Sequence, residues 1–233
     1  MTTPAERGEV LRAILAVYEA RAVDMAEAIS TEMGAPIDMA LSDQAGAGRS
    51  HLKAFIRALD AFEWQRPMRP GTEGQDLVFE AAGVAGLITP WNWPMNQVVL
   101  KVGAALAAGC TMVLKPSEIA PMSSILFAEI MHEAGVPAGV FNMVNGDGPG
   151  VGPILASHPD IDVVSFTGST RAGILISKAA ADTVKTVSLE LGGKSPNLVF
   201  NDTDVDDAVA RGANFCFANT GQSCNAATRM LVE

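Results

Sequence analysis

The sequence predicts an α/β fold in which a Rossmann-like parallel sheet carries helices on both of its faces. From residue 82 onward, short apolar runs alternate with helical segments. Those runs are continuously apolar, which is typical of strands that are buried on both faces of a parallel sheet. The chain has 233 residues, of which 48% are hydrophobic and 18% charged, so it can bury a substantial core and does not resemble a disordered or fibrous chain.

Two long helices are expected before the sheet begins. Residues 8–33 carry apolar side chains at helical spacing, and a second amphipathic helix is expected at about residues 39–61. The segment 63–74 cannot extend that helix, because it contains two prolines and two glycines. With a short strand expected at residues 76–80, we predict that this region forms a protruding hairpin arm.

Strand and helix then alternate along the chain. The expected strands are 84–89, 111–114, 140–144 and 163–167, and the expected helices are 95–108, 123–134, 151–157 and 170–181. In a parallel sheet of this kind, ligands bind beyond the carboxyl ends of the strands. That rule places a ligand site at segments 89–92, 115–118, 146–152 and 168–169.

Composition excludes several classes of function. Lys and Arg number 16 and Asp and Glu 26, so the net charge is −10, and such a surface repels nucleic acid and anionic membranes. The longest nearly apolar stretch, residues 98–114, is interrupted by Lys101 and rich in small residues, so we expect no membrane span. Three cysteines without a CxxC pair, together with polar first residues, favour a reducing, cytoplasmic location.

Two glycine-rich segments and three histidines do not form the motifs that they suggest. The segment 146–152 (GDGPGVG) does not fit GxGxxG, and the segment 191–195 (LGGKS) lacks the first glycine of a P-loop. His51, His132 and His158 are dispersed along the chain, and no second histidine stands at the spacing of a zinc helix. We therefore predict no metal site.

Two strand ends carry residues that suit a nucleotide. Lys115 can hold ribose hydroxyls or phosphate, and Glu118 can accept a hydrogen bond from a ribose 2′-OH while repelling a 2′-phosphate. Gly168 and Ser169 begin a helix whose free N–H groups and dipole favour a pyrophosphate. Taken alone, the first segment is better explained as a solvated turn with a helix cap, and the second is a weak signal because Ser or Thr at a helix start is ordinary capping.

Cys224 is a candidate nucleophile in the segment FANTGQSCNAATR at residues 217–229. Gly221 and Gln222 break a helix before it and leave the thiol at a loop tip, where a backbone N–H can face the reacting atom. No histidine is near in sequence, so the candidate base is Glu190, whose carboxylate is suited to activating a water. An isolated cysteine is more often a buried structural thiol, which is the interpretation we give to Cys110 and Cys216.

Five motifs, in order, resemble the superfamily of NAD(P)-dependent aldehyde dehydrogenases. They are TPWNWP at 89–94, KPSE at 115–118, FTGST at 166–170, LELGGKSP at 189–196 and GQSC at 221–224. The resemblance extends over the whole chain. Ala104 and Ala227 stand where members of the family often carry proline, which should not affect the chemistry.

The resemblance implies a mechanism. Cys224 attacks the aldehyde carbonyl, and the amide of Asn92 with the backbone N–H of Cys224 stabilises the oxyanion. Hydride transfer to the nicotinamide leaves a thioester, and Glu190 is the general base for the water that hydrolyses it. Lys101 serves as an electrostatic relay in some members. The product is a carboxylic acid.

The resemblance also implies the cofactor site. Lys115 and Glu118 would bind the adenosine ribose, Gly168 and Ser169 the pyrophosphate, and Trp91 would line the site. The full set of implied cofactor-binding residues is Thr89, Pro90, Trp91, Asn92, Lys115, Ser117, Glu118, Gly148, Gly152, Gly168, Ser169 and Leu191. Because Glu118 disfavours a 2′-phosphate, NAD is preferred, and NADP is the second candidate.

By the same resemblance, residues 1–62 and 82–192 form a cofactor-binding domain, 63–81 an oligomerisation hairpin and 193–233 the start of a catalytic domain. Family members are roughly twice as long, so we expect a fragment that lacks an amino-terminal arm and most of the catalytic domain. The full-length protein is expected to act on an aldehyde as a homodimer or homotetramer. Two alternatives stay open: a remnant that binds nucleotide or joins oligomers without turnover, and a cysteine hydrolase or acyltransferase that needs no NAD.

Overall fold

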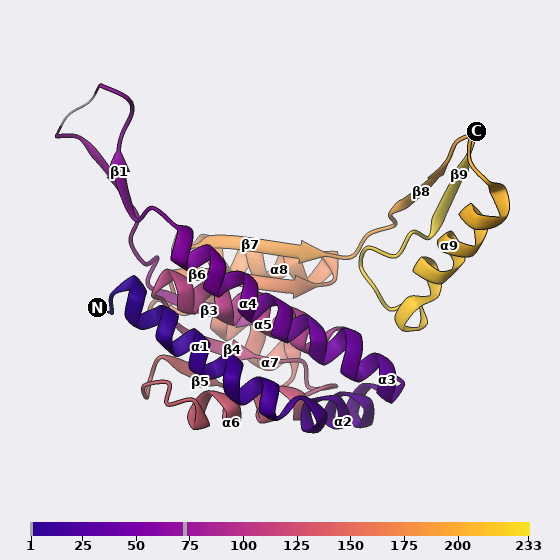
Figure 1. The fold of residues 1–233 in the computed structure, drawn as a ribbon. Coiled ribbons are helices and arrows are strands. Elements are labelled where there is room, and N and C mark those ends of the chain that lie inside the picture. The colour runs from indigo at the N-terminus through magenta and orange to yellow at the C-terminus, as the bar shows by residue number, and fades with distance from the viewer. Residues whose placement is uncertain (1, 72–73) are drawn as a thin grey trace.

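A computed structural model describes residues 2–71 and 74–233. It confirms the predicted α/β fold, because its centre is a five-stranded sheet in which every pair of neighbours is parallel (Figure 1). The strand order is β5-β4-β3-β6-β7. The strands are β3 (Val84–Ile88), β4 (Thr111–Lys115), β5 (Phe141–Met143), β6 (Val163–Gly168) and β7 (Thr186–Leu191).

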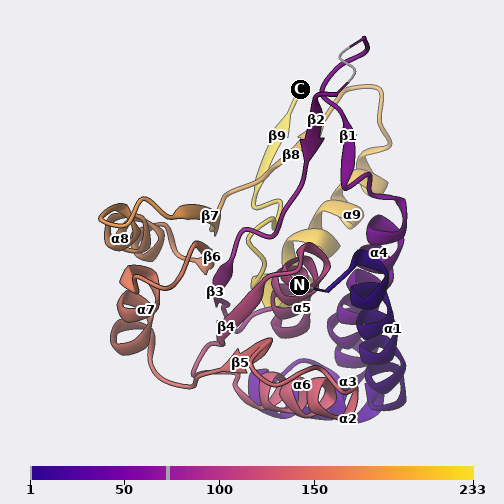
Figure 2. The same cartoon turned by 90° about the vertical axis from the view of Figure 1, so that its left-hand side faces the viewer.

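Helices cover both faces of this sheet (Figure 2). On one face lie α5 (Pro94–Ala108) and α6 (Met122–Glu133), and on the other lie α7 (Gly148–Ser157) and α8 (Thr170–Ala181). The apolar side chains form one core on each face, and the larger core also includes helices from the amino-terminal part of the chain. Burial on both faces explains the continuous apolar runs of β3 and β4, whereas the edge strands β5 and β7 are partly exposed.

The amino-terminal helices pack against α5 and α6, but the predicted single helix at residues 8–33 is wrong. The structure has α1 (Pro4–Ala20) and α2 (Ala22–Met33), separated by Arg21, whose φ of −104° and ψ of 20° are not helical. The first helix begins earlier than expected because Thr3 and Glu6 form a reciprocal capping box. At the break, the Arg21 guanidinium forms ion pairs with Glu129 and Glu133 of α6.

The second predicted helix, residues 39–61, is interrupted in a different way. A short α3 (Ile37–Met39) leads into a π-helical turn, η1 (Ala40–Ala45), which continues as α4 (Gly46–Ala61). Such a turn inserts an extra residue into the helical ladder, and it is frequent at functional sites. Gln44 lies in this turn, and its side chain is fully buried.

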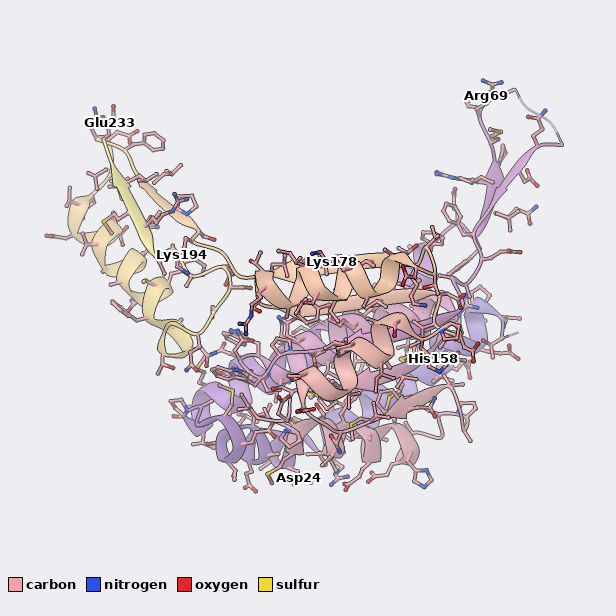
Figure 3. All side chains as sticks on the ribbon, turned by 180° about the vertical axis from the view of Figure 1, so that it is seen from behind. Asp24, Arg69, His158, Lys178, Lys194 and Glu233 are labelled. Atoms are coloured by element: carbon pink, nitrogen blue, oxygen red, sulfur yellow. The ribbon has the colours of Figure 1, made fainter. Side chains whose placement is uncertain are left out.

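A hairpin arm projects from the body, as Figures 1 and 3 show. Its strands are β1 (Gln65–Pro67) and β2 (Asp76–Val78), paired antiparallel, so the expected strand at 76–80 is two residues shorter. The arm is anchored at its base, where the Arg7 guanidinium lies over the Trp64 ring at 4.6 Å. Residue 1, at the start of the predicted cofactor-binding domain, and residues 72–73, within the predicted hairpin, lie outside the described residues.

The C-terminal part follows the carboxyl end of β7 and leaves the body at Lys194 (Figure 3). It consists of β8 (Pro196–Val199), α9 (Val205–Phe217), the 3-10 turn η2 (Ala218–Gly221) and β9 (Arg229–Val232). The two strands pair parallel with each other in a separate small sheet. Helix α9 buries none of its residues, and large apolar side chains such as Phe200 and Phe217 are exposed.

Within the part of the chain that the structure describes, no helix combines the length and the apolar character needed to cross a membrane.

Candidate active site

Two cavities meet at the loop that carries Cys224. The first, of about 1030 Å³, lies over β3, β6 and β7 beside α5, and we call it the face cavity. The second, of about 690 Å³, lies beyond the carboxyl ends of the same strands, and we call it the end cavity. Four residues line both cavities: Gln97, Thr167, Ser223 and Cys224. The thiol therefore lies between two spaces that can each hold a molecule.

The loop before Cys224 reverses direction through three consecutive left-handed residues. Asn219 and Thr220 each have a φ of 54°, and Gly221 has a φ of 74°. Glycine adopts this conformation freely and asparagine tolerates it, but a β-branched threonine is strained there. The turn leaves the Cys224 side chain exposed at the junction of the two cavities.

Asn92 contacts this loop directly. Its side-chain Nδ2 donates a hydrogen bond to the backbone oxygen of Gln222 at 2.7 Å. The next residue adds a second tie, since Trp93 Nε1 donates to Ser223 Oγ at 2.8 Å. One N–H of the Asn92 amide remains for another acceptor, because a carboxamide group carries two. The structure thus brings together the predicted oxyanion donor and the predicted nucleophile.

Glu190 and Lys101 both line the face cavity. Glu190 lies near the end of β7 and is exposed, whereas Lys101 projects from α5 and is only 9% exposed. The ammonium Nζ of Lys101 donates to Ser165 Oγ at 2.8 Å. Burial lowers the pKa of Lys101 to about 8, and the negative charge of Glu190 partly opposes that shift.

Lys115 and Glu118 come together at the end of β4. Lys115 is 2% exposed, and its Nζ donates to the oxygen of Pro116 at 2.6 Å and to Glu118 Oε2 at 3.3 Å. Glu118 Oε1 accepts from the backbone N–H of Gly148 at 3.2 Å. Hydrogen bonds from its own backbone N–H and from that of Gly148, with the charge of Lys115, hold the pKa of Glu118 below its usual value.

Gly168 and Ser169 lie where β6 passes into α8. A Cβ on Gly168 would lie 2.5 Å from Phe166 Cζ, so no other residue fits without a shift of that ring. The hydroxyl of Ser169 caps α8 by accepting from the N–H of Ala172 at 3.2 Å. The helix N-terminus therefore opens towards the end cavity, where N–H groups and the helix dipole favour an anion.

The other predicted cofactor residues divide into two groups. Pro90, Trp91 and Leu191 line the end cavity with Asn92, Gly168 and Ser169. The second group does not line it, and neither do Lys115, Glu118 and Gly148. Thr89 is buried, and its Oγ1 has no hydrogen-bond partner among the residues that the structure describes; Ser117 is buried after the end of β4, and Gly152 is buried within α7. Thr89 still connects the two strand ends, because its N–H donates to the oxygen of Lys115 at 3.2 Å.

Motif reasoning missed two buried amides near the site, Gln44 and Asn219. Asn219 lies within the segment around Cys224, and its tolerance of left-handed backbone was an available signal. Gln44 gave no signal, because it lies in a distant helical segment and only the tertiary fold brings it to Asn92. Among the described residues, no three His, Cys, Asp or Glu side chains are grouped as a metal site.

Comparison with known proteins identifies the class to which this fold and site belong. Residues 1–233 match the aldehyde dehydrogenase family, so the chain belongs to that family. It is 55% identical over 232 residues to a 3-succinoylsemialdehyde-pyridine dehydrogenase of a Pseudomonas species, a match that covers 99% of this chain and 48% of the relative. The chain spans about half the length of the curated relatives that it matches.

Solved structures agree with this assignment. An aldehyde dehydrogenase from Bartonella henselae is 60% identical with a TM-score of 0.98, covering 100% of this chain and 49% of that one. A variant of aldehyde dehydrogenase C from Pseudomonas syringae, in complex with NAD+ and octanal, is 48% identical with a TM-score of 0.96. That match covers 99% of this chain and 47% of the other.

Proposed function

We propose that this chain carries the nucleophile and the cofactor site of an enzyme that oxidises an aldehyde to a carboxylic acid with NAD. The observation that carries the proposal is the position of Cys224 between the face cavity and the end cavity. One cavity would hold the aldehyde and the other the nicotinamide, with the thiol within reach of both. Membership of the family and the NAD+ complex of the Pseudomonas syringae relative support it.

The residues at the strand ends fit a dinucleotide. Gly168 lacks the Cβ that would meet the Phe166 ring, and the N–H groups at the start of α8 would hold the pyrophosphate. Lys115 and Glu118 would bind the adenosine ribose, and the carboxylate of Glu118 would repel a 2′-phosphate, which favours NAD over NADP. When bound, NAD supplies an acceptor for the hydride that leaves the substrate carbon.

The chain's own residues would perform the remaining chemistry. Cys224 Sγ adds to the aldehyde carbonyl carbon, and the free N–H of the Asn92 amide with the Cys224 backbone N–H stabilises the oxyanion. After oxidation the acyl group is held on Cys224 as a thioester. Glu190, at the wall of the face cavity, removes a proton from the water that hydrolyses this thioester. Lys101 places a positive charge in the same cavity and so acts on Glu190 through space.

We extend the proposal to the division of the chain. Residues 1–62 and 82–192 would form the cofactor-binding domain, 63–81 an oligomerisation hairpin and 193–233 the start of a catalytic domain. The exposed strands of the arm leave backbone N–H and C=O groups for pairing with another chain, which suits a homodimer or homotetramer.

The test is the formation of NADH from NAD and a panel of aldehydes. It is run on the 233-residue chain and on the complete reading frame of its gene, because the chain spans about half the length of its relatives. We expect Cys224→Ala to abolish turnover and to leave NAD binding intact. Cys216→Ala is the matched control, since Cys216 lines neither cavity, and it should retain activity. Undiminished NADH formation by Cys224→Ala would refute the proposed mechanism.

One alternative function has its own observation in its favour. The chain spans about half the length of its relatives, and its C-terminal part exposes large apolar side chains. A protein that binds NAD or joins oligomers without turnover would show nucleotide binding in the same experiment and no NADH with any aldehyde.

A further inference from the structure

Three carboxamide or backbone amide groups from distant segments meet in a buried cluster beside the Cys224 loop. Gln44 comes from the π-helical turn η1 and is 0% exposed. Its Nε2 donates to the backbone oxygen of Asn92 at 3.2 Å and to Asn219 Oδ1 at 3.4 Å. Asn219 Nδ2 donates to the same Asn92 oxygen at 2.8 Å. Asn92 thus accepts two hydrogen bonds at one carbonyl.

The direction of these bonds follows from the chemistry of the partners. The backbone oxygen of Asn92 can only accept, so both Gln44 and Asn219 must turn an NH₂ group towards it. With its Nδ2 engaged in this way, Asn219 presents Oδ1 to Gln44. The cluster therefore has one hydrogen-bonded arrangement, and it couples η1 to the turn before Cys224.

The cluster is not explained by stability alone. Gln44 Oε1 is buried and has no hydrogen-bond partner among the described residues. Burying an unsatisfied acceptor is unfavourable, and an apolar side chain of similar volume at this position would avoid that cost. The turn that holds Gln44 is itself fixed, since Tyr18 Oη donates to the oxygen of Ala45 at 2.9 Å.

We propose, on the basis of the function proposed above, that Gln44 is a positioning residue that sets the orientation of Asn92 relative to Cys224. By fixing the Asn92 carbonyl together with Asn219, it fixes the peptide from which the Asn92 side chain projects. That side chain donates to Gln222, two residues before Cys224. The oxyanion donor and the nucleophile are thereby held in one geometry by a residue that contacts neither the substrate nor the thiol.

Two reactions of Cys224 in the 233-residue chain distinguish an effect on the position of the oxyanion donor from an effect on the accessibility of the thiol. In acylation by p-nitrophenyl acetate, the thiolate adds to the ester carbonyl to form a tetrahedral oxyanion. That oxyanion collapses to a thioester as p-nitrophenolate leaves. In alkylation by iodoacetamide, the thiolate displaces iodide in one step and no oxyanion forms. Mass spectrometry of the peptide that contains Cys224 distinguishes it from Cys110 and Cys216.

Gln44→Met keeps the side-chain volume and removes both hydrogen bonds. We expect it to slow acylation of Cys224 about 10-fold while alkylation stays within about two-fold of the parent, because only acylation needs the oxyanion donor. Asn219→Gly is a second variant that keeps the left-handed backbone accessible and removes the amide, and it should behave in the same way. Ser157→Ala is the control, since it removes only a hydrogen bond to the oxygen of Ile154 within α7, a helix that lines neither cavity, and should change neither rate.

Asn92→Ala distinguishes failure of this inference from failure of the proposed function. It removes the donor itself and should slow acylation by about 100-fold. If Asn92→Ala slows acylation but folded Gln44→Met and Asn219→Gly acylate at the parent rate, the inference about Gln44 is overturned and the proposed function stands. An equal fall in acylation and alkylation would also overturn it, since that indicates a disordered loop. If Asn92→Ala leaves acylation unchanged, the proposed oxyanion role fails and the inference fails with it.

Discussion

The body of the molecule and its C-terminal part are stabilised in different ways. The sheet and its helices enclose two apolar cores, with side chains such as Leu11 and Met112 fully buried. In the C-terminal part, α9 buries no residue, and every residue of β9 is exposed. Cys224 belongs to the second region, while Asn92, Glu190 and the proposed cofactor residues belong to the first. The candidate site is thus assembled across a junction between a well-packed region and a poorly packed one.

Polar contacts, more than apolar packing, hold that junction together. The hydrogen bonds from Asn92 to Gln222, from Asn219 to Asn92 and from Trp93 to Ser223 all cross it. Hydrogen bonds are directional, so they fix the angle at which a side chain is presented. Apolar burial contributes more free energy but is not directional. We infer that apolar burial in the body stabilises the fold, while the hydrogen bonds at the junction orient the Cys224 loop relative to Asn92.

A matched pair of leucine substitutions should give the largest difference between the two regions. Leu11→Ala removes a side chain that is 0% exposed in α1, and we expect it to lower the free energy of unfolding by about 4 kcal/mol. Leu198→Ala removes a side chain that is 57% exposed in β8, and it should cost less than about 1 kcal/mol. Urea unfolding followed by circular dichroism measures both. Equal losses would show that the C-terminal part has a core of its own.

The next effect concerns a charge buried in the body. Burial lowers the pKa of Lys101 to about 8 from 10.5, so between these values the unfolded chain binds more protons than the folded one. The free energy of unfolding should therefore rise with pH through this window, by about 3 kcal/mol at roughly 1.4 kcal/mol per pKa unit. Lys101→Met removes this dependence, so the variant should be more stable than the parent at pH 7 and lose that advantage near pH 10.5.

Lys178→Met is the matched control for this experiment. Lys178 is exposed on α8, so its replacement also removes one lysine charge but does not change the lining of the face cavity. The measurement is the difference in unfolding free energy between variant and parent at a series of pH values. A flat difference for Lys101→Met would mean that its ammonium is solvated, and the face cavity would then be open to water at that point.

The sheet could be predicted from the sequence, whereas two features of the amino-terminal helices could not. Strands buried on both faces leave a local signal, and the rule for ligand sites in parallel sheets then points to the strand ends. The break at Arg21 left no such signal, because apolar spacing continues from α1 into α2. At this break Arg21 forms ion pairs with Glu129 and Glu133 of α6, and those contacts depend on the tertiary fold. The π-helical turn likewise left no signal in the apolar spacing.

The candidate site shows the same limit. Residues within compact motifs, such as Glu118 and Cys224, could be proposed because their neighbours in sequence are also their neighbours in space. Glu190 was proposed from its own segment as the candidate base and Lys101 from the family resemblance, but the partner that holds Lys101 was not proposed. Ser165 lies 64 residues away and meets it only across the sheet face. Contacts of this kind depend on the fold and leave no pattern in the sequence.

The smallest effect compares two helix caps, one in each region. Asp147 Oδ1 accepts from the N–H of Gly150 at the start of α7, and Asp204 Oδ1 accepts from that of Asp207 at the start of α9. Replacing either aspartate by alanine should destabilise its helix by about 1 kcal/mol. In the body the loss should appear in the free energy of global unfolding, because α7 packs on the sheet.

In the C-terminal part the same loss should appear as local opening. Because α9 buries no side chain, it can open while the sheet stays folded, so Asp204→Ala should speed amide hydrogen exchange in residues 205–217 and leave global unfolding unchanged. Asp204→Ser retains a capping oxygen and should exchange nearly as slowly as the parent. If Asp147→Ala and Asp204→Ala lowered the global free energy equally, the two regions would unfold as one unit. The Cys224 loop would then become disordered only when the sheet itself unfolds.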